Sequence, residues 1–317
     1  MIDIIKLTKR KKLGLLITAL ILLVSCILYS LADRYLIEHV EVRVANEVDQ
    51  NKPTADAAVE EDTEQQVQQD DWSYKSASTS IQIEKVETGS GSDKITYFVA
   101  DVQLTETSVL QAAFAKNSFG RNIIEKTSTI AAEHNAIFAI NGDYYGFRDD
   151  GVIIRNGTLY RDEPVRDALA LLSDGSIKSY NEEQLSSSAL LAEGVLHTYS
   201  FGPILVKDGA VADDFSKVAI DKNFGNRSIQ GSNPRTGVGM ISPNHYVFVV
   251  VDGRKDNYSK GMTLAEFANV FAELGAAEAY NLDGGGSSTM YFMGRVVNSP
   301  AGKEQERGVS DILYISE

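Results

Sequence analysis

The sequence is poor in the residues that support disulfide, zinc and imidazole chemistry. Its 317 residues include one cysteine, Cys26, four histidines and one tryptophan. A single cysteine excludes an internal disulfide framework, so the folded part must be stable through the size of its core. The histidines are scattered, and no H-x-x-x-H pair or second cysteine is present. We therefore predict no metal site and no cofactor.

Basic residues are also scarce: 30 lysines and arginines face 44 acidic residues, for a formal net charge of -14. A nucleic-acid partner is not expected, because such proteins present basic surfaces. Much of the acidic excess lies between residues 46 and 71, where apolar residues are sparse. This composition predicts a solvated stem. Its acidic residues, set against the single cation Lys52, are Glu47, Asp49, Asp56, Glu60, Glu61, Asp62, Glu64, Asp70 and Asp71.

One long hydrophobic run is present, at residues 13–32, after the basic residues Lys6, Lys9, Arg10, Lys11 and Lys12. A charge-free run of this length is long enough to span a bilayer, and the basic flank places the rest of the chain outside. A cleaved signal peptide ending at Ser30-Leu31-Ala32 and a lipoprotein signal at Cys26 are the alternatives. The run is long and continues past Cys26, which favours an uncleaved anchor.

These features divide the chain into four parts. We predict a cytoplasmic basic tail at 1–12, a transmembrane signal anchor at 13–32, a juxtamembrane segment and acidic stem at 33–75, and an extracellular domain at 76–317. The protein would thus be a single-pass protein of the cell membrane.

The sequence predicts that the domain itself is β-rich. Residues 81–86 and 94–104 predict paired strands, and 245–252 predicts a central buried strand. Residues 122–134 and 263–274 have the periodicity of amphipathic helices, the second with a Thr263–Glu266 capping box. Asn156-Gly157, Asp174-Gly175 and Asp208-Gly209 predict two-residue type I′ hairpins. Residues 221–233 predict an exposed loop over the site. We expect an α+β (mixed α/β) fold, with helices packed on a mixed sheet.

One stretch near the C-terminus stands out: Asp283, three glycines at 284–286, then Ser287, Ser288 and Thr289, between two apolar runs. Adjacent glycines are entropically costly, so they indicate a close approach of the backbone or a positive φ. Glycine N–H groups and hydroxyls together suit an anion such as phosphate. The pattern is neither a P-loop nor a nucleophile elbow. A glycine-rich turn that binds nothing is the alternative.

Other charged residues follow strongly apolar runs, which predicts them at strand ends. Such carboxylates and arginines either form structural ion pairs or make a site in which arginine grips phosphate bidentately. Asn141-Gly-Asp143 is echoed by Asn281-Leu-Asp283, and in a strand each pair would share one face. The charged residues are Asp143, Asp252, Asp283, Arg155, Arg235, Arg254 and Arg307.

Taken in order, these motifs resemble the phosphodiester glycosidase domain from about Ser80 to the C-terminus. The resemblance implies hydrolysis of a sugar 1-phosphodiester, of the N-acetylglucosamine 1-phosphate type, at the glycosidic carbon. The N-terminal anchor and the absence of cysteines from the domain after it resemble those of a Gram-positive bacterial surface protein, with teichoic acids or exopolysaccharides as substrates. The motifs are 141–145, Arg155-Asn-Gly157, Phe201-Gly-Pro203, Arg235-Thr236, Asp252-Gly-Arg254, 283–288 and 306–313.

A phosphate monoester leaves as a weak base, so the site needs cations and N–H donors more than a general acid. We expect Asp283 or Asp143 as nucleophile or base and Glu306 as an acid. A glycan-binding domain without catalysis and a transglycosidase are the alternatives. The remaining expected substrate contacts are Asn141, Arg155, Arg235, Thr236, Asp252, Arg254, Gly284, Gly285, Gly286, Ser287, Ser288 and Arg307.

Overall fold

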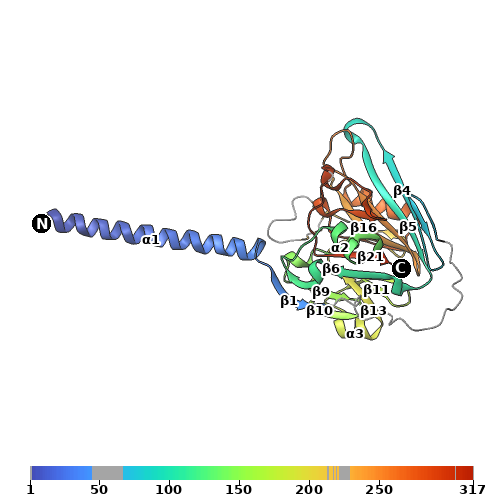
Figure 1. Cartoon of the computed structure of the whole chain (residues 1–317), viewed down its shortest axis with the longest axis horizontal. Helices are drawn as coiled ribbons and strands as arrows, with labels where there is room; N and C mark the ends of the chain where they lie inside the picture. The colour runs from blue at the N-terminus through green and yellow to red at the C-terminus, as the bar shows by residue number, and fades with distance from the viewer. Residues whose placement is uncertain are drawn as a thin grey trace, which may run out of the picture.

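The computed structural model describes residues 2–44, 67–212, 214–216, 218, 220, 229–303 and 305–316. A helix, α1 (Ile2–Tyr35), projects from a β-rich domain (Figure 1). Its segment Leu13–Asp33 has a mean hydropathy of 2.6 and none of it is buried, so its length and composition suit a membrane span. Most of the predicted acidic stem, and residues 221–228 of the predicted loop, lie outside the described residues.

The described strands form two main sheets and three smaller ones. The nine-stranded sheet has the order β15 (Ala210–Val211), β14 (Ile204–Lys207), β18 (Glu278–Asn281), β16 (Arg235–Ser242), β17 (His245–Val251), β5 (Ile95–Leu104), β4 (Thr79–Thr88), β3 (Ser73–Lys75) and β2 (Gln68–Gln69). The five-stranded sheet has the order β20 (Arg295–Val296), β19 (Met290–Phe292), β8 (Ala136–Asn141), β21 (Asp311–Ser316) and β6 (Leu110–Phe114). The smaller sheets are β12 (Ile177–Asn181), β11 (Asp167–Leu172) and β13 (Val195–Tyr199); β10 (Thr158–Glu163) and β9 (Gly151–Arg155); and β1 (His39–Arg43) and β7 (Ser118–Arg121).

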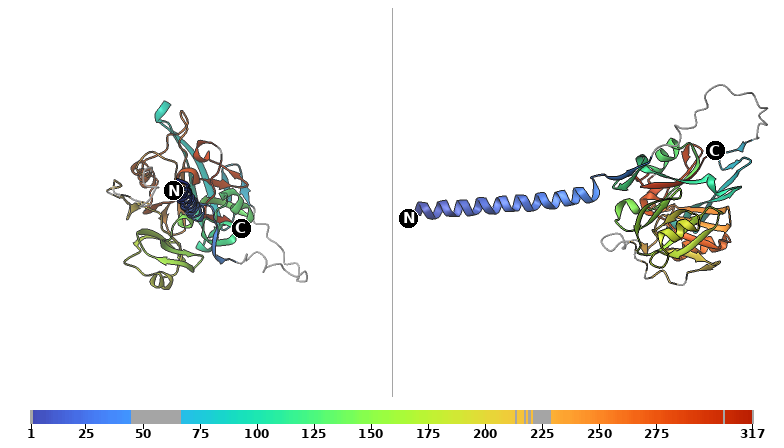
Figure 2. Two further views of the ribbon diagram at one scale, coloured as in Figure 1. Left: turned by 90° about the vertical axis from the view of Figure 1, so that its left-hand side faces the viewer. Right: turned by 90° about the horizontal axis from the view of Figure 1, so that it is seen from below.

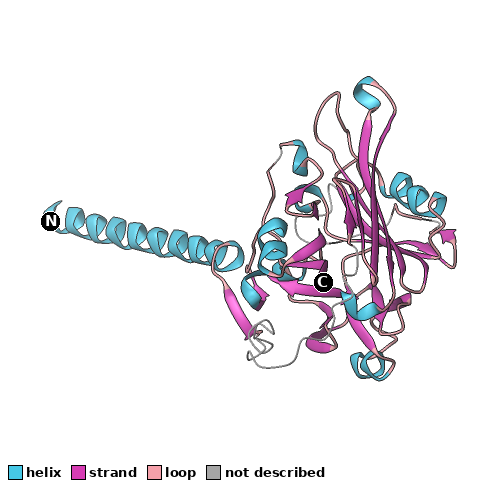
Figure 3. Cartoon of the chain, turned by 45° about the vertical axis from the view of Figure 1, so that its right-hand side comes forward, coloured by secondary structure: helices cyan, strands magenta, loops and turns pink. Residues whose placement is uncertain are grey.

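The two main sheets pack face to face, with helices on their outer faces (Figure 3). Phe138 of β8 meets Phe248 of β17 in the shared core, with 5.2 Å between ring centroids. This confirms the α+β class. The described strand pairs are all antiparallel, so the expected mixed sheet is wrong. Hairpins account for the pairs β4–β5 and β16–β17, whereas pairs such as β5–β17 and β8–β21 join strands distant in sequence, whose direction is set by the tertiary fold.

Helix α5 (Leu264–Glu273) covers the outer face of the nine-stranded sheet. Its capping box forms as predicted: Thr263 accepts from the N–H of Glu266, whose carboxylate returns to the N–H of Thr263. Phe267 and Phe271 are fully buried on β16. A Cβ at Gly237 would lie 2.9 Å from Phe267, so glycine is required for this approach. The helix thus holds in place β16, the strand that begins at Arg235.

Helix α2 (Thr127–Glu133) covers the five-stranded sheet, and α3 (Ser187–Ala192) packs on the three-stranded one. The predicted helix at 122–134 starts five residues late, because Asn122 has a φ of 58° and Glu125 pairs with Val309 instead. The hairpins at Asn156-Gly157 and Asp208-Gly209 have positive φ at both residues, as predicted. At Asp174-Gly175 only the glycine does, so that prediction of a type I′ turn is wrong.

The segment after α1 is docked on the domain. Strand β1 pairs with β7, and the side chain of Asn122 donates to the carbonyls of Asp33 and Ile37, each at 2.9 Å. Figure 2 shows α1 leaving the domain at this point. Strands β1, β2 and β3 also extend the folded part N-terminal to residue 76. The acidic residues that follow β1 therefore do not separate the domain from α1.

Low pH is expected to destabilise the folded protein through His197. This imidazole is buried; its Nδ1 accepts from the N–H of Asn156 at 3.3 Å, and Nε2 faces the carbonyl of Leu110 at 3.2 Å. Burial, and secondarily Arg155, lower its pKa to about 3. The unfolded chain, with a pKa near 6.5, takes up the proton first. Stability from this group is thus complete above pH ~6.5 and falls by about 1.4 kcal/mol per unit towards pH 3.

Urea unfolding at several pH values measures this dependence in the wild type and in His197→Gln. Glutamine keeps a donor and an acceptor but does not titrate. The variant should lose less stability per pH unit below 6.5. Equal slopes in the two proteins would contradict the assignment.

Candidate active site

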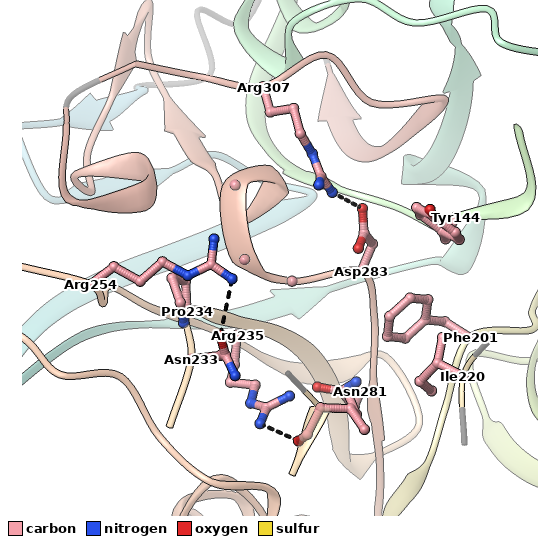
Figure 4. A pocket seen from close by; sticks show the side chains of 14 residues that line it. Tyr144, Phe201, Ile220, Asn233, Pro234, Arg235, Arg254, Asn281, Asp283 and Arg307 are labelled. Carbon is pink, nitrogen blue, oxygen red and sulfur yellow. Dashed lines mark hydrogen bonds and ion pairs between the residues drawn. The ribbon is translucent and has the colours of Figure 1, made fainter. Parts of the chain in front are cut away.

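A cleft of about 150 Å³ opens where β16 begins and β18 ends (Figure 4). On this measure about 10–15 Å³ is enough to hold one water, so the space has room for a phosphate group with part of a sugar ring. Both main sheets contribute, because the segment after β18 crosses to β19 of the five-stranded sheet. The lining residues are Tyr144, Phe201, Ile220, Ile229, Asn233, Pro234, Arg235, Arg254, Asn281, Asp283, Gly284, Gly285, Gly286 and Arg307.

The glycines at 284–286 form one edge of the cleft, in and before the 3-10 turn η6 (Gly285–Ser287). A Cβ at Gly284 would lie 2.8 Å from the carbonyl of Pro234, and Gly285 has a φ of 66°. The prediction of a close approach and a positive φ is confirmed. The N–H of Gly285 donates to Pro234, so the N–H groups of Gly284 and Gly286 are the candidates for an anion.

Asp283 is the only carboxylate among the described residues that line the cleft. One oxygen, Oδ2, accepts from Arg307 Nη2 at 2.8 Å and from Ser287 Oγ at 2.6 Å. Arg307 also donates to Ser287 Oγ through Nε at 3.0 Å, so the three side chains hold one another. The other oxygen of Asp283 has no partner in the described part of the chain. A charged, oriented carboxylate oxygen is thus available to a ligand.

Arg235 and Arg254 bring positive charge to the cleft without a matching carboxylate. Arg235 is 2% exposed, and it donates to the carbonyls of Met262, Ile229 and Gly231. Neither arginine has a carboxylate within 4.0 Å among the described residues. Burial, followed by the charge of Arg254, lowers the pKa of Arg235 to about 10. Its guanidinium is therefore still charged at neutral pH, and a buried charge that has carbonyl acceptors but no counter-charge is costly.

An aromatic surface lies on the other side of Asp283 from Arg254 in Figure 4. Tyr144 and Phe201 pack edge to face, with 6.1 Å between ring centroids. Asn281 lies between this surface and the arginines. Its Nδ2 donates to the carbonyl of Gly202 at 2.8 Å, which leaves the buried Oδ1 without a partner in the described residues. Such a surface suits a sugar ring, which has apolar faces and hydroxyl donors.

Several predicted substrate contacts lie behind the cleft and hold its walls. Asn141 donates to the carbonyl of Asp283 at 2.7 Å and accepts from Thr236 Oγ1 at 2.8 Å and from the N–H of Thr289 at 3.1 Å. It thus ties β8 to the ends of β16 and β18. Ser288 is fully buried beside this contact.

Asp143 does not line the cleft either. It accepts from the N–H of Tyr144 at 2.5 Å, from the N–H of Ser200 at 2.7 Å and from Arg148 Nη2 at 3.1 Å. These bonds position Tyr144 and Phe201, the aromatic wall. Arg155 is likewise buried and forms an ion pair at 2.7 Å with Asp311, which raises the pKa of Arg155 despite its burial.

Asp252 and Glu306 face away from the cleft. Asp252 is buried and accepts from Tyr258 Oη at 2.7 Å, Asn298 Nδ2 at 2.9 Å and the N–H of Ser299. Glu306 accepts from the N–H of Ser128 at 2.9 Å and from its hydroxyl, at the start of α2. The structure thus offers no acid in the cleft from Glu306.

The structure gathers seven of the predicted residues at the cleft and adds others that the sequence did not assign. Tyr144, Phe201 and Asn281 belong to motifs already noted, but their roles were not predicted. Asn233, Pro234, Ile220 and Ile229 have no local signal of this kind, apart from the loop expected over the site. The seven predicted residues are Asp283, Gly284, Gly285, Gly286, Arg235, Arg254 and Arg307.

Fold and cleft together define an antiparallel α+β domain with a cationic, glycine-edged cleft that holds one carboxylate. The sequence profile of the phosphodiester glycosidase family matches residues 134–316, more than half of the chain. The chain belongs to the phosphodiester glycosidase family.

Relatives of the chain are distant. It is 29% identical over 245 residues to the SPbeta prophage-derived uncharacterized protein YomE of Bacillus subtilis (strain 168). That match covers 70% of this chain and 36% of the relative, so the chain spans about a third of its length.

Two solved structures share the fold. The catalytic domain of zebrafish N-acetylglucosamine-1-phosphodiester alpha-N-acetylglucosaminidase, auto-inhibited by its pro-peptide, has a TM-score of 0.57 and 19% identity, covering 75% of this chain and 83% of that one. A hypothetical protein from Synechocystis has a TM-score of 0.55 and 14% identity, covering 75% and 62%.

Proposed function

We propose that the domain hydrolyses a sugar 1-phosphodiester at the bond between the glycosidic carbon and the phosphate oxygen. The observation that carries this proposal is Arg235, a buried guanidinium without a carboxylate partner beside Arg254. A phosphate in the cleft would supply the missing negative charge. The family assignment supports the same class of reaction, and the name of the zebrafish relative makes N-acetylglucosamine 1-phosphodiesters the first substrates to test.

The single carboxylate of the cleft also fits this chemistry. Ordinary glycosidases use two carboxyl groups, one of which protonates the leaving oxygen. A phosphate monoester leaves without that proton. Asp283 would attack the sugar carbon or deprotonate the water that does so, and the electron pair of the broken bond would pass to the phosphate oxygen. Arg235, Arg254 and the N–H groups at the glycine edge would stabilise the negative charge that develops.

The proposal is tested with full-length protein in detergent and a panel of sugar 1-phosphodiesters in ¹⁸O-labelled water. We expect free reducing sugar, with the label in the sugar. Label in the phosphate would indicate a phosphodiesterase instead. Glycan binding without turnover of any substrate would favour a binding domain, and transfer to an added glycan acceptor would indicate a transglycosidase.

Gly285→Ala is expected to separate the loop's function from its contribution to stability. An alanine at positive φ costs about 1–2 kcal/mol, and here its Cβ would also lie 3.1 Å from Arg254 Nη2. Gly209→Ala is the matched control, since it has a φ of 75° but nothing within 4 Å. Both variants should lose similar stability in urea unfolding. Only Gly285→Ala should also lower kcat/KM, by about tenfold or more; equal activities would contradict a role for the loop.

We also propose that α1 is a signal anchor and that the domain lies outside the cell. There it would act on substrates of the cell surface, such as phosphodiester-linked wall glycans or exopolysaccharides. The apolar length of α1 and its basic flank support this orientation. A Glu183→Cys variant should react with a membrane-impermeant maleimide on intact cells. The wild type, whose one cysteine is Cys26 in α1, is the control. Labelling that requires cell lysis would place the domain inside.

A further inference from the structure

We propose that a second groove, next to the cleft, binds the anionic backbone of a polymeric sugar phosphate. This inference rests on the proposed function for the identity of the polymer. The groove has a volume of about 510 Å³, against about 150 Å³ for the cleft. Its principal residues come from β4, β5, β20 and the segments near them: Trp72, Lys85, Phe98, Tyr258, Arg295 and Asn298.

The groove has an aromatic floor. Trp72, the one tryptophan of the chain, stacks on Phe98 with 6.3 Å between ring centroids and 10° between ring planes. The ring of Tyr258 is oriented by the bond from its hydroxyl to Asp252. Trp72 and Tyr258 are half-buried, so part of each ring faces the groove. Aromatic faces of this kind pack against the apolar faces of sugar rings.

Cations lie over these aromatic rings. The guanidinium of Arg295 lies 4.9 Å from the centre of the Trp72 ring, and Lys85 and Lys255 lie 5.9 Å and 5.0 Å from that of Tyr258. A ring orients a cation without neutralising its charge. Lys85 also forms an ion pair with Glu87 at 2.7 Å, whereas Arg295 has no carboxylate within 4.0 Å in the described residues.

Glu306 is the one carboxylate among the described residues that line the groove. Glu306 turns both of its oxygens to the N–H and hydroxyl of Ser128. The groove is lined by two cations, Lys85 and Arg295, against this one carboxylate. In a chain with a net charge of -14, such a surface is a local exception, and it favours a polyanionic ligand.

One short segment, residues 254–258, contributes to both the cleft and the groove, through Arg254 and Tyr258 respectively. Arg254 lines the cleft, and the next residue, Lys255, faces Tyr258 of the groove. The turn η7 (Pro300–Gly302) packs on this segment so closely that a Cβ at Gly302 would lie 2.7 Å from Lys255 Cβ. A polymer of sugar phosphates carries a negative charge in every repeat. It would therefore meet cations both in the cleft and beside it, which a single sugar phosphodiester would not.

Trp72 gives a direct readout that does not depend on catalysis. Full-length protein in detergent is titrated with a purified poly(N-acetylglucosamine 1-phosphate), and indole fluorescence is recorded. We expect a saturable change with the polymer and none with a monomeric sugar 1-phosphodiester. Arg295→Gln should weaken polymer binding about tenfold, the loss expected for one charge-assisted contact. The control Lys207→Gln, on an exposed hairpin, should bind like the wild type.

Three outcomes would contradict a polymer-binding role for the groove. These are no fluorescence change with the polymer, equal weakening of polymer binding by the two variants, or binding of inorganic polyphosphate as tight as that of the polymer, which would show ion exchange without sugar recognition. Failure of the proposed function is recognised separately. If no phosphodiester is cleaved but polymer binding depends on Arg295, then polymer binding by the groove is supported and the proposed hydrolysis is not.

Discussion

Asp283→Asn is expected to lower the rate of sugar release by about 10³-fold. Asparagine has the size of aspartate and its side-chain oxygen can still accept from Arg307 and Ser287, but it has no negative charge to attack the sugar carbon or to take a proton from water. The effect should appear in kcat, because the lost interaction matters most in the transition state. Steady-state assays with the substrate that gives the most reducing sugar measure it.

The matched control for this variant is Asp208→Asn, at an exposed hairpin turn where asparagine tolerates the positive φ. It should retain wild-type activity and thermal stability. If Asp283→Asn is as active as this control, the carboxylate of the cleft is not the reactive group. The buried Asp143 would then be the candidate nucleophile, provided that substrate binding makes it accessible.

Arg235→Gln is expected to abolish the stabilisation that phosphate gives to the folded protein. A ligand at 100 times its dissociation constant stabilises the native state by about 2.7 kcal/mol. In the wild type, inorganic phosphate should raise the unfolding free energy in this way, since it would pair with a buried guanidinium. The variant should show little phosphate effect and a kcat/KM reduced by about 10²–10³-fold.

Arg161→Gln controls for the structural part of this change. Arg161 is also a buried arginine whose guanidinium donates to three carbonyls, those of Tyr145, Arg148 and Asp150, but it lies outside the cleft. Both variants should lose stability without phosphate. When phosphate is added, only Arg161→Gln should be stabilised by as much as the wild type. An equal phosphate response in the two variants would exclude Arg235 from the anion site.

The sequence predicted the glycine edge and Asp283 because their signal is local. Three adjacent glycines after an apolar strand specify a tight backbone wherever that strand lies. The arginines needed more: that Arg235 and Arg254 converge depends on the pairing of β16 with β17, which brings residue 235 opposite 251. Alternating patterns indicated these strands, but not which charged ends would meet.

The prediction for Asp143 shows where the local argument stops. Residues two apart share a face only while the strand continues, and β8 ends at Asn141. The chain then turns, and Asp143 points to Arg148 and Ser200. The partners of Arg155 and Glu306, Asp311 and Ser128, are each more than a hundred residues away in sequence. Pairings at such separations are set by the tertiary fold, which no window of sequence contains.

The pairing of β1 with β7 limits how far the domain can search. Between the end of α1 at Tyr35 and the start of β1 at His39 lie three residues, a leash of about 10 Å when fully extended. With α1 in the bilayer as proposed, the domain would lie close to the lipid headgroups. The substrates within its reach would then be those that lie next to the membrane surface.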